Sequence, residues 1–266
     1  MDSVCVICFK ILPMPHRYGL IGYPLGHSFS RRYFTEKFVR ENIPDAQYEL
    51  FPLPDIAQFP ALLRDHPDLR GLNVTIPHKQ SVLSFLDRLD ETAAAVGAVN
   101  CIRIAKGRLE GFNTDVFGFE QSLSAFLKKN GALPGHLNAF VLGAGGAARA
   151  VAYVLKKLAI PFLTVSRTPQ RPGEISYAAL ASAVTEAPAL FVNTTPLGMS
   201  PHTETCPELP FERIGPAHLV FDLVYNPAET LLLQRAAQQG AAVQNGLEML
   251  HLQAEKAWDI WQSDRD

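Results

Sequence analysis

The chain contains 266 residues, of which 47% are hydrophobic and 19% are charged, and its formal net charge is −2. This composition is typical of a soluble globular protein, and the length suits one large domain or two modest ones. A net charge so close to zero gives no sign of a nucleic-acid-binding or membrane-binding surface, and no apolar run is long enough to span a bilayer.

The four cysteines do not form a metal-binding pattern. Cys5 and Cys8 have C-x-x-C spacing, but Cys101 and Cys206 stand alone, so a four-thiolate zinc site lacks its second pair. We expect four reduced thiols in a cytoplasmic protein, and no metal.

Residues 1–17 look unlike the rest of the chain. Residues 4–9 are apolar, but Asp2 precedes them and Lys10 follows, so they lack the positively charged start of a signal peptide. We expect residues 1–17 to be either a disordered leader or an over-long start, with Met14 as the real initiator.

From residue 18 onward, strands and helices alternate at the spacing of β-α-β units, which predicts an α/β fold. The first half closes with a hairpin turn at Lys106-Gly107-Arg108 and with a helix that begins at 113–115 and runs to residue 129. Strands are predicted over 18–23, 48–53, 98–104 and 109–111, with another that ends in the segment 71–79, and helices over 30–41, 56–65 and 86–96.

Two serines follow the first predicted strand. Ser28 is placed to cap the helix over 30–41, and capping is the simplest role for both Ser28 and Ser30. The alternative is that the two hydroxyls face an anionic or polyhydroxyl ligand.

Lys79 is a candidate acid or base. It follows Pro77, which suits the first position of a helix. The positive end of the helix dipole disfavours a charged lysine there, so we expect its pKa to shift toward the working range of a proton donor. An ordinary surface lysine is the alternative. Asp115 fits an ordinary helix-start residue, and His78 a structural one.

The stretch around residue 143 organises the second half. An apolar strand over 139–142 leads into a glycine-rich turn and a helix over 147–158, so that Gly143, Gly145 and Ala148 fit G-x-G-x-x-G/A. Gly143 allows the tight turn, Gly145 lets the backbone approach a pyrophosphate, and Ala148 lets the helix pack closely on the strand. Free N–H groups at the helix start then face the phosphates. A plain strand-to-helix turn remains the alternative.

The next strand suggests which dinucleotide binds. It ends in Ser166-Arg167-Thr168, with Arg171 shortly after. An NAD site would place an acidic residue here for the ribose 2′-hydroxyl, whereas guanidinium groups match a 2′-phosphate. The sequence therefore favours NADP, unless these arginines lie in a solvated loop.

The repeated pattern predicts two α/β domains with a cleft between them. Strands near 138–142, 161–166, 189–193, 219–224 and 241–244 predict a Rossmann-type doubly wound parallel sheet in the second. We expect a leader over 1–17, a substrate-binding domain over 18–115, a linking helix over 116–130, a nucleotide-binding domain over 131–245, and a last helix within 246–266 that packs back on the first domain.

Taken together, these stretches resemble the shikimate dehydrogenase family, from residue 18 to residue 261. The motifs that carry the resemblance are Gly26-His27-Ser28-Phe29-Ser30, Asn73-Val74-Thr75-Ile76-Pro77-His78-Lys79, Gly97-Ala98-Val99-Asn100, Asn113-Thr114-Asp115, Gly143-Ala144-Gly145-Gly146-Ala147, Asn193-Thr194-Thr195-Pro196, and Gly246 with Met249 and Gln253.

The resemblance implies NADPH-dependent, reversible reduction of 3-dehydroshikimate to shikimate in aromatic amino-acid biosynthesis, by a monomer or homodimer without nucleic-acid or membrane partners. Lys79 and Asp115 would be the catalytic pair. Substrate would be bound by Ser28 and Ser30 at its carboxylate, with Tyr225 nearby, and by Thr75, Asn100 and Gln253 at its hydroxyls. Cofactor would be bound by Gly143, Ala144, Gly145, Gly146, Ala147, Ser166, Arg167, Thr168, Arg171, Glu91, Leu223 and Gly246.

The chain departs from the family pattern at a few positions. Ser166 stands where Asn is usual, which puts one adenosine contact in doubt, and Arg31 stands where Pro is usual. The leader has no counterpart in the family.

Three other functions remain open. A relative that also oxidises quinate with NAD is disfavoured by Arg167 and by the Ser-x-Ser pair, because quinate-accepting relatives tend to carry Thr at the second position. A non-catalytic NADP-binding regulator would not need Lys79 with Asp115. A folate-type dehydrogenase of similar plan would not explain the paired serines.

Overall fold

The computed structural model describes residues 16–26 and 28–263. Most of the expected leader, residues 1–15, therefore lies outside the described residues. His16 and Arg17, which we expected in the leader, instead begin strand β1 (His16–Gly22). The leader prediction is wrong for these two residues, because their backbone pairs with a second strand that lies thirty residues further along the chain.

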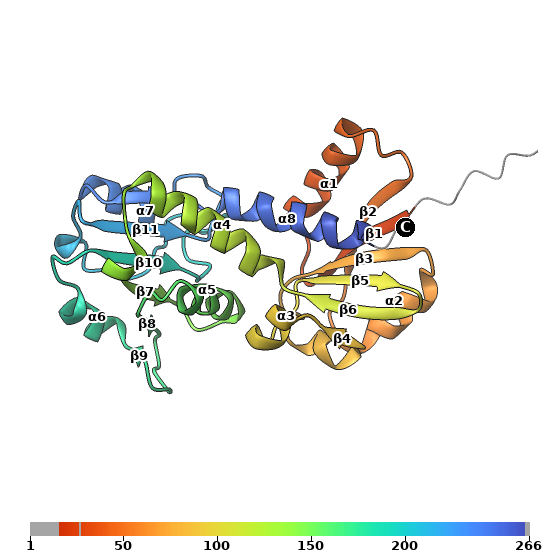
Figure 1. Cartoon of the computed structure of the whole chain (residues 1–266), viewed down its shortest axis with the longest axis horizontal. Coiled ribbons are helices and arrows are strands. Elements are labelled where there is room, and N and C mark those ends of the chain that lie inside the picture. Colours follow the sequence, from red (N-terminus) through yellow and green to blue (C-terminus); the bar gives the residue numbers. More distant parts are fainter. Residues whose placement is uncertain (1–15, 27, 264–266) are drawn as a thin grey trace, which may run out of the picture.

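The first half of the chain forms a six-stranded mixed sheet in the order β2-β1-β3-β5-β6-β4 (Figure 1). β1 pairs in parallel with β2 and β3, whereas β5 runs antiparallel to β3 and β6. The predicted hairpin joins β5 to β6, with Lys106 and Gly107 at φ 51° and 75°, which suits a two-residue turn. The elements are α1 (Phe29–Arg40), β2 (Ala46–Pro52), η1 (Ile56–Gln58), α2 (Phe59–Asp65), β3 (Leu69–Val74), η2 (Ser81–Phe85), β4 (Arg88–Leu89), α3 (Glu91–Val96), β5 (Cys101–Ala105) and β6 (Arg108–Phe112).

Two predictions for this half are wrong. Residues 86–90 are not helical: Arg88 and Leu89 form β4 beside β6, and α3 begins only at Glu91, after the cap Asp90. Pairing with β6 is a long-range interaction that local periodicity does not reveal. In addition, no α-helix begins at Pro77, because residues 76–80 form turns that lead into the 3₁₀ helix η2.

The second half forms the predicted parallel sheet. Its order is β12-β11-β10-β7-β8-β9, which is the 3-2-1-4-5-6 order of a doubly wound dinucleotide-binding fold. The predicted strands are present within about two residues, and the sequence missed only the short edge strand β9. The elements are η3 (Pro134–His136), β7 (Asn138–Leu142), α5 (Gly146–Lys157), β8 (Phe162–Val165), β9 (Glu174–Ile175), α6 (Tyr177–Ala183), β10 (Ala189–Asn193), η4 (Phe211–Arg213), β11 (His218–Asp222), α7 (Leu231–Gln238) and β12 (Ala242–Gln244).

Two long helices, α4 (Thr114–Lys129) and α8 (Leu247–Gln262), run side by side and join the sheets (Figure 1). As predicted, α8 returns to the first sheet. There the rings of Trp258 and Trp261 lie 5.2 and 5.0 Å from that of Tyr18, and Trp261 Nε1 donates to the Ile102 carbonyl at 2.9 Å. The exact domain boundaries that we expect, at residues 115, 130 and 245, stay a prediction.

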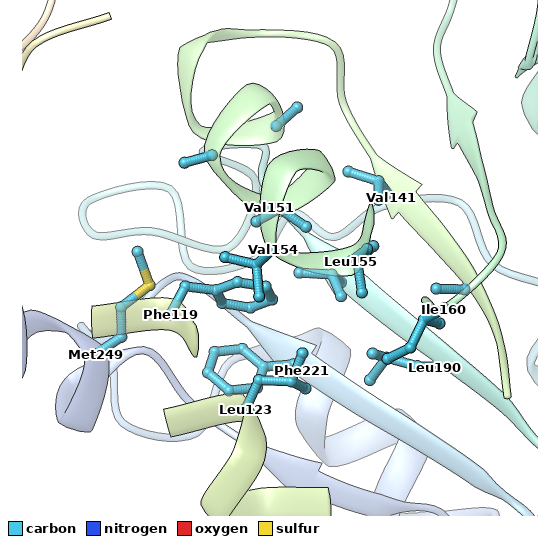
Figure 2. Packing of buried hydrophobic residues seen from close by; sticks show 14 of the residues in the cluster. Phe119, Leu123, Val141, Val151, Val154, Leu155, Ile160, Leu190, Phe221 and Met249 are labelled. Atoms are coloured by element: carbon cyan, nitrogen blue, oxygen red, sulfur yellow. The ribbon is translucent and has the colours of Figure 1, made fainter. Parts of the chain in front are cut away.

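Helix α4 also belongs to the core of the second sheet. Figure 2 shows Phe119 and Leu123 of α4 beside Phe221 of β11, with Val154 of α5 packed above them. The rings of Phe119 and Phe221 meet edge to face at 5.3 Å. Any side chain in the first turn of α4 is therefore carried by a helix that is fixed to both sheets.

Within residues 16–26 and 28–263, no helix combines the length and the apolar character needed to cross a bilayer. The same residues contain no group of three or more His, Cys, Asp or Glu side chains that could hold a metal ion.

Candidate active site

The site centres on an ion pair between Lys79 and Asp115. Lys79 Nζ lies 2.6 Å from Asp115 Oδ2, and the two side chains are 25% and 14% exposed. Asp115 lies in the first turn of α4, whose N-cap is Asn113. The Lys79 carbonyl accepts a hydrogen bond from the Val99 N–H at 2.8 Å, which fixes its turn against the segment that leads into β5. Because this turn is not helical, the helix-dipole argument for Lys79 does not hold, and its charged partner is the Asp115 carboxylate.

Asn100 and Gln253 complete this polar cluster. Asn100 Nδ2 donates to Asp115 Oδ1 at 2.9 Å and lies 3.5 Å from Gln253 Oε1 on α8. Thr114 links them, since its N–H donates to Asn100 Oδ1 at 2.7 Å and its hydroxyl lies 3.4 Å from Gln253 Oε1. The structure thus brings together four of the predicted site residues from four separate segments.

A second line of buried polar groups leads from this cluster toward Ser30. Asn73 Nδ2 donates to the Asn100 carbonyl at 3.3 Å, and the Tyr48 hydroxyl donates to Asn73 Oδ1 at 2.7 Å. Burial raises the pKa of Tyr48 well above its usual value, and a hydrogen bond with Ser30 opposes that shift. The sequence reasoning missed Tyr48 and Thr114; Asn73 and Thr114 belong to recognised motifs, but nothing in the sequence points to Tyr48.

Ser28 and Tyr225 line a different pocket, between α1 and the loop after β11. The Ser28 hydroxyl accepts from the Arg31 N–H at 3.4 Å, so Ser28 caps α1 as predicted. The Tyr225 ring meets Phe29 edge to face at 5.7 Å, and burial raises the Tyr225 pKa. Thr75 directly follows β3, half-buried. The pocket is lined by Gly26, Ser28, Phe29, Arg31, Arg32, Thr35, Glu36, Leu50, Tyr225, Asn226, Ala228 and Leu247.

A pocket of about 760 Å³ lies at the carboxyl ends of β7, β8 and β10. Gly143 has φ 104°, and a Cβ there would lie 2.8 Å from Thr194 Oγ1, so only glycine fits this turn. A Cβ at Gly145 or Gly146 would meet open space, and no side chain caps the start of α5. The pocket is lined by Gly143, Ala144, Gly145, Val165, Ser166, Arg167, Thr168, Tyr177, Thr194, Thr195, Pro196, Leu197, Cys206 and Glu208.

These features fit a dinucleotide. Uncapped N–H groups at the α5 N-terminus suit a pyrophosphate, and Arg167 at the end of β8 suits a further phosphate. The lining residue Tyr177 carries a pKa raised by burial, with Arg167 acting in the opposite sense. Tyr177 and Glu208 belong to no motif, and the sequence reasoning missed them.

The remaining cofactor candidates lie outside this lining. Gly146 and Ala147 form the first turn of α5, Arg171 is exposed in the loop before β9, and Glu91 begins α3. Leu223 and Gly246 are in close backbone contact: the Leu223 carbonyl leaves no room for a Cβ on Gly246. The roles of these residues stay predictions.

A buried acid at the end of β11 was also missed. Asp222 accepts hydrogen bonds from Asn193, Val224 and Thr230. Burial raises its pKa, and the bonds from Thr230, Val224 and Asn193 act against that rise. The sequence did offer one signal for Asp222, since an acidic residue at the carboxyl end of a predicted parallel strand lies where such sheets bind their ligands.

Comparisons with known proteins agree with this geometry. Residues 20–102 match the family model described as the shikimate dehydrogenase substrate binding domain. The NADP(+) shikimate dehydrogenase of Symbiobacterium thermophilum is 40% identical over 270 residues, which cover 91% of this chain and 87% of that protein. The corresponding protein of Desulforamulus reducens is 36% identical over 260 residues, with coverage of 91% and 88%.

A solved structure gives the same result. Shikimate 5-dehydrogenase of Thermus thermophilus, in complex with NADP(H) and shikimate, has 34% sequence identity and a TM-score of 0.80, and the match covers 93% of each chain. Relatives of this similarity span almost the whole length of the protein. The chain therefore belongs to the shikimate dehydrogenase family.

Proposed function

We propose that this protein catalyses the NADPH-dependent, reversible reduction of 3-dehydroshikimate to shikimate in aromatic amino-acid biosynthesis. The observation that carries the proposal is the 2.6 Å pair of Lys79 and Asp115, in which Asp115 also accepts a hydrogen bond from Asn100. The names of the relatives, NADP(+) shikimate dehydrogenases, support the same reaction.

The substrate is held by residues of the first half of the chain and of α8. Ser28 and Ser30 bind its carboxylate, and the Tyr225 side chain lies near that end of the pocket. Asn100, Gln253 and Thr75 bind ring hydroxyls. Asn100 and Gln253 are suited to this role because both are buried, Asn100 donates to Asp115, and Gln253 Oε1 lies 3.5 Å from Asn100 Nδ2. A hydroxyl placed between them is oriented toward Lys79.

Lys79 supplies the proton that the reduced ketone needs. Its ammonium donates to the substrate oxygen and stabilises the negative charge that develops there. Asp115 pairs with the lysine and holds it in the site, and Asn100 in turn orients Asp115 by donating to its other oxygen. When bound, the nicotinamide supplies the hydride that the carbonyl carbon receives.

The cofactor is held in the pocket at the ends of β7, β8 and β10. Gly143, Ala144, Gly145, Gly146 and Ala147 bind its pyrophosphate through backbone N–H groups. Arg167, flanked by Ser166 and Thr168, binds the 2′-phosphate, with Arg171 as a second cation. Glu91, Leu223 and Gly246 are further cofactor contacts in this proposal.

We also propose that the protein acts in the cytoplasm, a reducing compartment that suits four free thiols, and that it functions as a monomer or homodimer.

The decisive experiment is a steady-state assay that follows NADPH absorbance. NADPH should be consumed with 3-dehydroshikimate, and NADP should be reduced with shikimate and much more slowly with quinate. A higher kcat/KM for quinate with NAD would favour the quinate-oxidising alternative. Binding of NADP without turnover of any of these compounds would favour a non-catalytic regulator.

A further inference from the structure

A buried polar relay connects the cofactor pocket with the Tyr225 loop. At its centre lies Asp222, the last residue of β11, which is fully buried. Its Oδ1 accepts from Asn193 Nδ2 at 2.9 Å and from the Val224 N–H at 3.0 Å, and its Oδ2 accepts from the Thr230 hydroxyl at 2.6 Å. A buried carboxylate with three donors is energetically tolerable only while those donors keep their positions.

One arm of the relay ends in the cofactor pocket. Asn193 Oδ1 accepts from the Thr195 N–H at 2.9 Å and from the Thr195 hydroxyl at 2.7 Å. Thr195 lines that pocket, and its methyl carbon lies 3.0 Å from where a Cβ on Gly143 would be. The orientation of Asn193, which Asp222 fixes, therefore sets the wall opposite the glycine turn.

The other arm ends at the substrate side. Val224, whose N–H donates to Asp222, directly precedes Tyr225 in the chain. The Val224 carbonyl accepts a hydrogen bond at 3.1 Å from the N–H of Gly246, the residue just before α8. Tyr225 lines the pocket that holds Ser28 and meets Phe29 of α1. Asp222 therefore fixes the start of the segment that carries Tyr225 across to the first half of the chain.

We infer that Asp222 is a positioning residue that holds both Thr195 in the cofactor pocket and the Tyr225 loop in place. Its loss should therefore weaken the binding of both ligands. This inference rests on the proposed function for the identity of the two ligands. Asp222 acts through Asn193 and Val224 and lines neither pocket.

The test measures dissociation constants by calorimetry for NADP and for shikimate, with the full chain and no turnover. Asp222→Ala should raise both constants on the order of tenfold, because the Asn193 amide and the Val224 N–H, one in each arm, both lose their acceptor. Asp222→Asn should restore most of the affinity, since its amide oxygen can still accept from Val224 and Asn193. Asn193→Ala removes only the arm that leads to the cofactor pocket. It should therefore weaken the binding of NADP and leave the affinity for shikimate almost unchanged.

His218→Ala is the matched control. His218 lies at the opposite end of the same strand and is 2% exposed. Both of its ring nitrogens are hydrogen-bonded, Nδ1 to the Gly215 N–H and Nε2 to the Thr185 carbonyl. It should lower the melting temperature while leaving both dissociation constants unchanged.

Three results would overturn the inference. Asp222→Ala could leave both dissociation constants unchanged, as expected for His218→Ala, or it could weaken the binding of only one ligand. Asn193→Ala could bind NADP with normal affinity. The last comparison decides the matter if Asp222→Ala does not fold. Wild-type protein that binds both ligands but does not reduce 3-dehydroshikimate would refute the proposed function and leave this test intact.

Discussion

Lys79 and Asp115 are thirty-six residues apart in the chain, yet Lys79 Nζ lies 2.6 Å from Asp115 Oδ2. The contact joins the turn after β3 to the first turn of α4, the helix that packs in the core of the second sheet. The pair is thus held at the point where the two halves of the molecule meet.

Lys79→Ala should lower turnover at least about a hundredfold, the usual scale for general acid–base catalysis. The affinity for NADP should barely change, because Lys79 does not line the dinucleotide pocket. Lys106→Ala, at the exposed hairpin tip, is the control and should be fully active. Near-normal turnover of Lys79→Ala would remove the proton-transfer role.

Asp115→Asn should also slow turnover, because the amide cannot hold the ammonium as a carboxylate does. If the pair acts as one unit, the double variant should lose less than the product of the two single losses. Steady-state kinetics of the four proteins measures this coupling. Fully multiplicative losses would show that the two side chains act independently.

The sequence predicted the second sheet well because most of its strands are short apolar runs bounded by turns, as at residues 138–142 and 189–193. It also singled out Asp115 and Asn100, which belong to polar motifs next to strands and lie side by side in the structure. It failed where long-range pairing decides the structure. The strand Arg88–Leu89 forms by pairing with β6, and Tyr48 reaches the site through hydrogen bonds with Asn73 and Ser30.

Arg167→Ala should raise the KM for NADP well over tenfold and leave the weak use of NAD nearly unchanged. A hydrogen-bonded arginine–phosphate pair contributes about 1.5–3 kcal/mol, and about 1.4 kcal/mol corresponds to a factor of ten. Arg171→Ala, further along the same exposed loop, should have a smaller effect. Equal losses with both cofactors would show that Arg167 does not distinguish them.

Ser28→Ala and Ser30→Ala should each raise the KM for shikimate more than they lower kcat. A carboxylate far from the reacting carbon is bound equally in the ground and transition states, so its loss affects binding alone. Ser28 also caps α1, which adds a stability loss of about 1 kcal/mol. Ser176→Ala removes the cap of α6 and controls for that loss. If neither serine variant changes KM, the two side chains are only structural.

Deletion of residues 1–13 should leave folding and activity intact, because the first described strand begins at His16. Deletion through Arg17 should lower the melting temperature clearly. It removes the first residues of β1 and the contacts of Arg17 with His66 and Asp68, at 2.7 and 3.1 Å. Thermal unfolding of the two truncated proteins and the full chain makes the comparison. A large loss already at residue 13 would show that the preceding segment packs on the fold.

The stability of the protein at alkaline pH should depend on Lys37. Its side chain is only 4% exposed, and Nζ lies 2.6 Å from Glu255 of α8 and 2.9 Å from Glu41. Burial lowers the Lys37 pKa, but the bonds to Glu255 and Glu41 outweigh it and the pKa is raised overall. A lysine whose folded pKa exceeds its unfolded value, about 10.4, stabilises the fold below that pH and loses the contribution as pH rises through the folded pKa.

Lys37→Met should therefore lower the free energy of unfolding by about 1.5–3 kcal/mol at pH 8, the scale of hydrogen bonds to charged groups. The difference from wild type should shrink steadily above pH of about 10.4. Urea unfolding across this range measures it. Lys157→Met is the control, because Lys157 pairs with Glu120 at 2.8 Å but is 55% exposed, so solvent screens the pair and little should change at either pH. A Lys37→Met difference that stays constant with pH would mean that the side chain stabilises α1 against α8 through packing rather than through its charge.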